Sequence, residues 1–181
     1  MITANQDEKG VVYDQLDELQ QYSRRECLES SGTPKLPDEN QQELIIELGS
    51  LAGVEIDEQD ISTVHRLPDT KASKDRMIVK FTRRAKKEEL YKNRRRLVKV
   101  TSEKLPSISR SGSKSKEKLF INESLTPYRK RLFGKINRFK KDNGFKFLWT
   151  QNGKILLKEH ESSRTYSFTK ESELNTFLDR R

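Results

Sequence analysis

Apolar residues recur at helical spacing in residues 10–25, where Val12, Leu16 and Leu19 lie 4 and 3 positions apart and Ser23 follows 4 positions later. This spacing is typical of a coiled-coil seam, although it covers barely two heptads. A helix of this length is marginal on its own in water. The segment is therefore either the end of a longer coiled coil or a helix that caps the domain after it.

Residues 26–124 contain segments with strand-like and helix-like patterns of apolar residues. Their order is strand, helix, strand, strand, helix, strand. The first helix is the clearest, because Leu44, Leu48 and Leu51 lie on one face and Gly53 follows them. This order is that of a split βαβ fold. The predicted elements span residues 26–32, 37–54, 62–67, 76–81, 82–97 and 118–124.

A serine-rich segment, residues 101–117, separates the last predicted helix of this domain from its last strand. It contains six serines, a proline and a glycine, with almost nothing to bury. The composition predicts a flexible loop. Because each doubling of loop length costs only about 0.6 kcal/mol, we expect this loop to be dispensable for folding.

Residues 125–181 predict a second unit with the order helix, strand, strand, strand, helix. Thr126 and Pro127 are typical of an N-cap and a first helical position. The third strand and the closing helix are expected at 164–168 and 170–178. An apolar stripe along the first helix contains Tyr128, Leu132, Ile136 and Phe139.

The first two strands of this unit form a predicted hairpin, closed by Asn152-Gly153 in a type I′ turn. The turn fixes the register, so Trp149 faces Leu156 and Leu148 faces Leu157. One face of the hairpin is then aliphatic, and the other is aromatic.

Both faces are apolar near the turn, although a helix needs to cover only one. If the aliphatic face is core, Phe145, Phe147 and Trp149 are available to stack on bases, at about 1–3 kcal/mol per base. Alternatively, the aromatic face packs on the helix. Hydropathy favours packing for Phe145 and Phe147 and leaves Trp149 undecided.

Charge is divided unevenly along the chain. Residues 1–75 hold 7 Lys and Arg against 17 Asp and Glu, whereas residues 76–181 hold 30 against 11. So large a positive charge favours the binding of polyanions, chiefly nucleic acid, because binding releases their counterions. The alternative is a solvated basic surface that keeps the protein soluble.

Composition excludes several classes of protein. One cysteine and two scattered histidines offer neither a disulfide framework nor zinc-ligand spacing. No apolar stretch resembles a signal peptide or a membrane span, which indicates a soluble, intracellular protein. The sequence has no Ser/His/Asp set, no phosphate-binding glycine loop and no acidic cluster in its basic half. We therefore expect no enzyme activity, no cofactor and no metal.

The segment KDRMIVKF, residues 74–81, resembles the central-strand motif of an RRM at its two ends, Lys74 and Phe81. Arg76 and Ile78 stand where stacking aromatics belong, and Glu29 in LESSGT replaces another. Residues 26–124 thus look like an RRM whose aromatic platform has been removed. Such a domain is expected to bind weakly and by charge.

The order of landmarks resembles one family over residues 11–178. RRECLESSGTP follows the coiled-coil pattern, VHRLP and RMIVKF precede a basic helix, and INESLTPYRKRLF leads to GFKFLWTQNGKILL. These landmarks are similar to the first-open-reading-frame RNA-binding proteins of LINE-type (non-LTR) retrotransposons and the related baculovirus few-polyhedra proteins.

This resemblance implies an α+β protein with three parts. A coiled-coil helix spans residues 1–25, an RRM-like split βαβ domain spans 26–124 with the loop at 101–117, and a small basic α-β-β-β-α domain spans 125–181. Proteins of this family form homotrimers through the coiled coil, coat single-stranded RNA and act as nucleic-acid chaperones. The coiled coil here is only a stub of that element.

The resemblance also implies where RNA would bind, in a cleft between the two domains. It assigns Lys71, Lys74 and Arg76 to one side, and Arg129, Arg131 and Trp149 to the other. Position in the basic half adds Lys80, Arg138, Lys141, Lys146 and Lys154.

The expected function is sequence-tolerant binding of single-stranded RNA, or of DNA, in a retroelement ribonucleoprotein. The expected location is the cytoplasm, with the nucleus as a second compartment. The alternative function is that of a viral or retroelement structural protein acting through protein–protein contacts.

Overall fold

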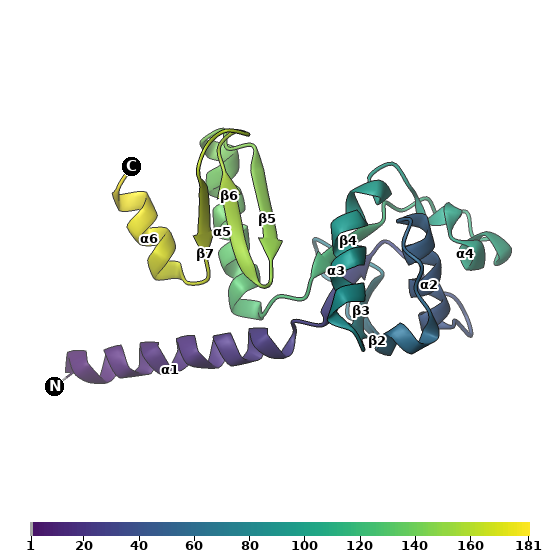
Figure 1. The fold of residues 1–181 in the computed structure, drawn as a ribbon, viewed down its shortest axis with the longest axis horizontal. Coiled ribbons are helices and arrows are strands. Elements are labelled where there is room, and N and C mark those ends of the chain that lie inside the picture. Colours follow the sequence, from purple (N-terminus) through teal and green to yellow (C-terminus); the bar gives the residue numbers. More distant parts are fainter. Residues whose placement is uncertain (1) are drawn as a thin grey trace. The chain divides into compact units, whose positions relative to one another are not determined.

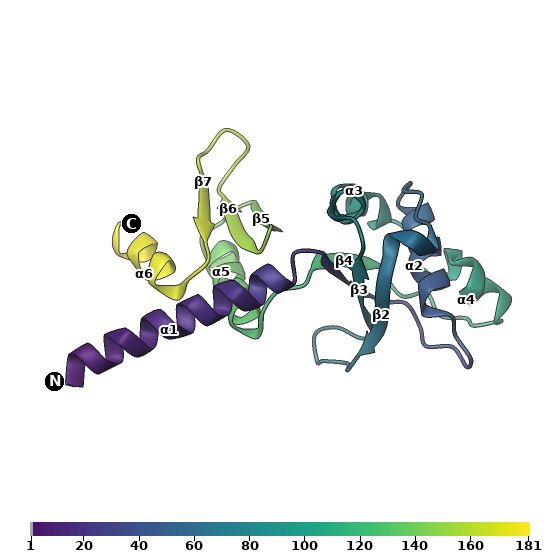
Figure 2. The same ribbon diagram turned by 60° about the horizontal axis from the view of Figure 1, so that its bottom comes forward.

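The computed structural model describes residues 2–181 and divides the chain into two compact units. One unit contains residues 26–124, and the other joins the N-terminal helix to residues 125–181. Each unit contains helices and one antiparallel sheet, so the fold is α+β (Figures 1 and 2). No helix among the described residues is long and apolar enough to cross a membrane.

The sheet of the unit at 26–124 has the order β2-β3-β1-β4, and all its neighbouring strands are antiparallel. Along β3 the side chains of Met77, Val79 and Phe81 are buried, and the residues between them face the other way. The buried face packs against α2 and α3 in one hydrophobic core. The elements are β1 (Cys27–Ser31), α2 (Gln41–Leu51), β2 (Ile61–Leu67), β3 (Arg76–Phe81), α3 (Arg84–Asn93) and β4 (Phe120–Glu123).

Helix α2 lies within the predicted range of 37–54 and is shorter at both ends. The Asn40 side chain accepts a hydrogen bond from the Glu43 N–H and caps the first turn. Gly53 follows the helix with φ of +74°, a conformation that favours glycine. Leu44 and Leu48 of α2 lie fully inside the core.

The expectation that residues 101–117 bury almost nothing is wrong for the first half of that segment. A 3-10 turn, η3 (Ser102–Lys104), and a short helix, α4 (Pro106–Arg110), place Leu105 and Ile108 in the core with no exposed surface. The buried Glu47 carboxylate of α2 accepts hydrogen bonds from the Ser107 N–H and hydroxyl. Two apolar residues three positions apart thus anchor a segment whose composition is dominated by serine.

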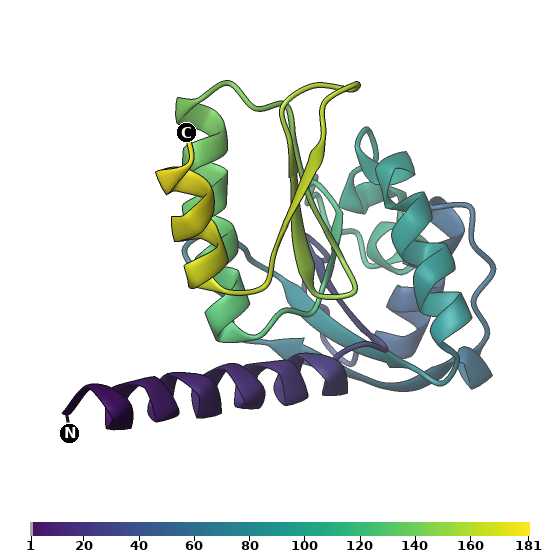
Figure 3. The ribbon, with the colours of Figure 1, turned by 60° about the vertical axis from the view of Figure 1, so that its left-hand side comes forward.

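The C-terminal unit has a three-stranded sheet in the order β5-β6-β7, with α5 and α6 on one face (Figure 3). Thr126 caps α5 by accepting a hydrogen bond from the Arg129 N–H, and Pro127 occupies the first turn, as expected. The core of the C-terminal unit contains Leu132, Ile136 and the aromatic residues around Phe177. The elements are α5 (Pro127–Asp142), β5 (Phe147–Gln151), β6 (Lys154–Lys158), β7 (Thr165–Phe168) and α6 (Glu171–Asp179).

The hairpin of β5 and β6 has the predicted register, with Trp149 opposite Leu156 and Leu148 opposite Leu157. Its turn residues Asn152 and Gly153 have φ of +51° and +76°. Positive values at both central positions are those of a type I′ turn, so the predicted turn is confirmed.

Helix α1 (Ile2–Ser23) packs on the C-terminal unit through a polar face. Asp14, Asp17, Glu18 and Gln21 lie on this face and contact residues of α5, its N-cap and the start of α6. The apolar positions of the predicted seam, Val12, Leu16 and Leu19, are all exposed. The helix therefore caps the C-terminal unit by hydrogen bonds and ion pairs, with its apolar residues facing solvent.

Candidate nucleic-acid interface

The hairpin strands bury one face and leave the other open. Thr150, Ile155 and Leu157 of the inner face are buried beneath α5. Trp149, Phe147 and Leu156 alternate with them and are only half-buried. The aliphatic face is thus the core face, and the aromatic face forms the outer surface of the sheet.

Phe145 behaves differently from the other two aromatics. It precedes β5, its N–H donates to the Lys140 carbonyl, and its ring packs against Phe139 at 5.4 Å between centroids. The packing favoured by hydropathy is therefore confirmed for Phe145 and wrong for Phe147. The difference arises because Phe145 lies outside the strand alternation, which turns Phe147 outward.

Cations flank the aromatic residues on the outer face. Lys154 and Lys158 of β6 share this face with Trp149 and Phe147, because directly paired residues of antiparallel strands point to the same side. Lys158 was not among the expected binding residues, although the predicted register already pairs it with Phe147. Lys146 is exposed at the start of the hairpin, and its N–H donates to the Glu159 carbonyl.

The basic side chains of α5 occupy a different surface. Arg131, Arg138 and Lys141 are exposed, whereas Leu132 and Ile136 of the same helix point into the core. Because α5 covers the inner face of the sheet, these cations do not share the outer face with Trp149. The C-terminal unit thus presents two basic surfaces rather than one.

Arg129 is a structural residue, and the prediction that it lines a binding site is wrong. Its side chain is 1% exposed. Nε donates to Asp17 at 2.8 Å, Nη2 to Glu18 at 2.7 Å and Nη1 to the Gly153 carbonyl at 2.8 Å. The guanidinium is therefore fully engaged in holding α1 and the hairpin turn to α5, and no phosphate can reach it.

On the open face of the other sheet, two charged residues stand at the positions of the stacking aromatics of the RRM motif, and they pair with each other. Arg76 Nη2 donates to the Glu29 carboxylate at 2.9 Å, and Nη1 donates to the Pro68 carbonyl. Both side chains are largely buried by this arrangement. Arg76 is therefore compensated within the fold. Lys80, on the same face, is exposed.

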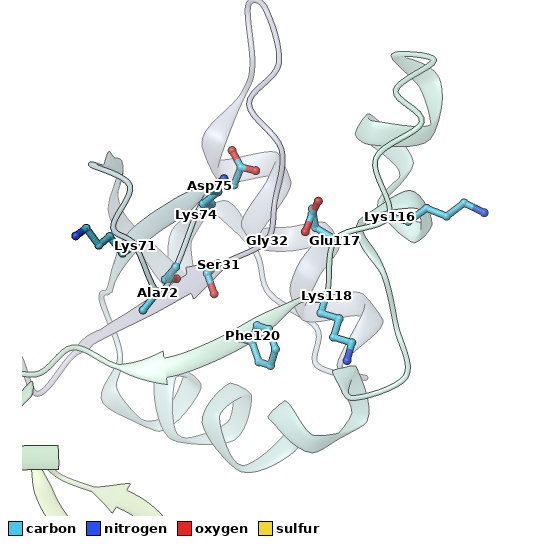
Figure 4. A pocket seen from close by; sticks show the side chains of 11 residues that line it. Ser31, Gly32, Lys71, Ala72, Lys74, Asp75, Lys116, Glu117, Lys118 and Phe120 are labelled. Carbon is cyan, nitrogen blue, oxygen red and sulfur yellow. The ribbon is translucent and has the colours of Figure 1, made fainter. Parts of the chain in front are cut away.

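Lys71 and Lys74 lie in the turn between β2 and β3, beside a hollow of about 550 Å³. Lys118 and Phe120 line its other side, and Ser31 and Gly32 at the end of β1 lie between the two (Figure 4). Phe120 did not figure among the expected binding residues. The alternation along β4, with Ile121 buried, is the signal that places it outside the core.

Residues 126–178 match the family model described as Baculovirus FP protein domain 2. The resemblance to the few-polyhedra proteins is confirmed for these residues. The matched range contains the hairpin, Trp149 and the basic residues of α5. No match to the chain is found among curated proteins.

Proposed function

We propose that the protein binds single-stranded nucleic acid, RNA or DNA, with little sequence preference. The observation that carries this proposal is the outer face of the C-terminal sheet. There Trp149 and Phe147 are half-buried between Lys154 and Lys158, whereas Thr150, Ile155 and Leu157 on the opposite face of the same strands are buried. Aromatic rings flanked by cations supply both contacts that sequence-tolerant binding of single strands requires, base stacking and phosphate neutralisation.

The strand order of the other unit is compatible with an RRM-like role. Its strand order, β2-β3-β1-β4, follows from a β-α-β-β-α-β chain whose two β-α-β halves interleave. The central strands of its open face carry the mutually compensated Arg76–Glu29 pair in place of aromatic residues. We therefore infer that the C-terminal unit dominates affinity.

In this proposal the protein is a binding protein and nucleic-acid chaperone rather than an enzyme, and it needs no cofactor. The match to an FP-family domain supports a protein of viral or retroelement kind. We infer that it acts in a ribonucleoprotein, in the cytoplasm or nucleus. Stacking without base-specific hydrogen bonds lets the protein exchange strands readily, which is what a chaperone does.

Tryptophan fluorescence tests the proposal, since Trp149 is the only tryptophan. Its emission should be that of a partly solvated indole and should be quenched by single-stranded RNA. Trp149→Ala should weaken binding by about 1–3 kcal/mol. Tyr13→Ala, which removes an exposed aromatic ring from α1, is the matched control and should change nothing. Emission that ignores RNA, or equal affinities for the two variants, would count against the proposal.

The exposed apolar residues of α1 favour a second candidate, an assembly role through helix–helix contacts. Val12, Leu16 and Leu19 are 61%, 48% and 69% exposed, although their spacing is that of a coiled-coil seam. Two heptads rarely hold a coiled coil without other contacts, so we expect mostly monomer at micromolar concentration. Sedimentation tests this, and a stable trimer with no RNA affinity would favour the assembly role.

A further inference from the structure

We propose that the unit at 26–124 has a nucleotide-binding site of its own at the edge strand β4, with Phe120 as the stacking surface. This inference rests on the proposed function, and it adds a second contact point for the same single strand. The two central strands of the sheet, β1 and β3, carry no aromatic residue on the open face. The exposed aromatic ring on this face is instead Phe120 of the edge strand.

Phe120 is placed as a binding ring rather than as core. It is 53% exposed, while Ile121 beside it is buried. Its partner across the strands is Ser31, which is too small to cover the ring. Gly32, Ala72 and Ser73 also line the hollow, so small residues make up part of its wall. The space beside the ring is open to a flat ligand.

The charge around this ring favours a phosphate-bearing ligand. Lys71, Lys74 and Lys118 are exposed, and none forms an ion pair with another residue that the structure describes. Lys116 also lines the hollow and pairs with Glu103 at 3.3 Å. Asp75 and Glu117 are the acidic residues of the lining. Lysines thus exceed carboxylates, and three of them have charges that a phosphate backbone can neutralise.

The turn that carries two of these lysines is fixed by hydrogen bonds. The Asp75 N–H donates to the Asp69 carboxylate at 2.9 Å, and the Thr70 N–H donates to the Ser73 carbonyl at 2.9 Å. The Gly32 N–H donates to the Lys74 carbonyl, which ties the turn to the end of β1. The site is therefore held in place before any ligand arrives.

Gly32 is the residue that lets the three segments meet. Its φ is +85°, and a Cβ atom at this position would lie 2.0 Å from the Lys118 carbonyl oxygen. Only glycine allows β1 to end so close to the segment that leads into β4. This close approach sets Lys118 and Phe120 beside the β2–β3 turn.

A single strand of nucleic acid fits these features better than an acidic peptide does. A base offers a flat face to the Phe120 ring, and the phosphates on either side of it carry the negative charge that the lysines attract. Stacking of this kind is tolerant of sequence, since every base has a π-face. An acidic peptide would satisfy the lysines and leave the ring uncovered.

The test compares the affinities of full-length variants for a labelled single-stranded oligouridine. Phe120→Ala should weaken binding about 5- to 150-fold and leave the salt dependence unchanged, because no phosphate contact is lost. Phe120→Tyr keeps the ring and should bind like the parent protein. Val98→Ala is the matched control, because Val98 is 72% exposed and lies outside the hollow. Circular dichroism melting curves establish that each variant folds.

Photocrosslinking of the parent protein gives a second readout that needs no variant. A strand containing 4-thiouridine should crosslink to the tryptic peptide 119–129, which contains Phe120. Equal affinity of Phe120→Ala and Val98→Ala, or crosslinks to other peptides but none to 119–129, would overturn this inference alone. A parent protein that binds no single strand would overturn both this inference and the proposed function.

Discussion

At the scale of single residues, a buried ion pair joins distant parts of the chain in each unit. Arg129 links α5 to Asp17 of α1, and Lys87 of α3 pairs with Glu123 of β4 at 3.1 Å. Removing one partner of such a pair leaves a buried charge without compensation, which costs about 3–5 kcal/mol. A count of basic residues in the sequence cannot identify these two, because their partners lie 112 and 36 positions away.

The stabilising role of the buried Arg129 can be tested by comparing its substitution with that of the exposed Arg131. Arg129→Ala should lower the free energy of unfolding by about 3–5 kcal/mol, because Asp17 stays buried without its partner. Arg131→Ala, two positions away and exposed, should change it by less than about 0.5 kcal/mol. Urea denaturation measures both. Equal effects would mean that Arg129 does not hold α1 in place.

A pH-dependent contribution comes from Glu39 and Arg66. The Glu39 carboxylate accepts from Arg66 Nε at 2.8 Å and Nη2 at 2.6 Å, and Arg66 also donates to the Thr33 and Pro34 carbonyls. The Arg66 hydrogen bonds are the main reason that the pKa of Glu39 lies below its ordinary value of 4.5. A lowered pKa in the folded state stabilises the fold above the unfolded value, and this contribution is lost as the pH falls through the folded pKa.

Glu39→Gln should therefore lower the melting temperature at pH 7, and the difference from the parent protein should shrink as the pH falls below the ordinary value of 4.5. Thermal melts at several pH values provide the measurement. Glu55→Gln, at an exposed position, is the control and should have little effect at any pH. A Glu39→Gln deficit that stays constant down to acidic pH would contradict the role of this pair.

At the scale of secondary structure, local chemistry was a reliable guide to turns and caps. Asn152-Gly153 fixes the hairpin register, and Thr126-Pro127 starts α5, because each depends only on neighbouring residues. The sequence could not predict residues 101–110 in the same way. Leu105 and Ile108 are buried by contacts with distant elements, and Glu47 supplies the hydrogen bonds that their serine-rich surroundings need.

Shortening a buried side chain tests whether residues 101–110 are anchored in the core. Leu105→Ala should lower the free energy of unfolding by about 2–5 kcal/mol, because it leaves a cavity in the core. Ser109→Ala, at an exposed position of α4, should have an effect below about 0.5 kcal/mol. Chemical denaturation distinguishes the two. A Leu105→Ala variant as stable as the parent protein would restore the interpretation of residues 101–117 as a dispensable loop.

At the scale of the whole molecule, the net positive charge is highest in residues 125–181, although residues 1–25 of the same unit add 3 Lys and Arg against 5 Asp and Glu. Residues 26–124 hold 20 Lys and Arg against 17 Asp and Glu, whereas residues 125–181 hold 14 against 6. The acidic residues of α1 engage Arg129 and Lys170 and leave the exposed cations of the hairpin uncompensated. The division of charge at residue 75 in the sequence therefore differs from the division between the folded units.

The measurement that tests the central claim most directly is binding of the full chain to single-stranded RNA over a range of salt concentrations. Affinity should fall linearly on a log–log plot, with a slope of about −0.7 for each phosphate contacted. Three or more contacts by the exposed lysines and arginines would give a slope steeper than about −2. Single-stranded DNA of the same length should show a similar slope, because phosphate contacts do not distinguish the two. Affinity that is equal at low and high salt would contradict binding through the basic surfaces described above.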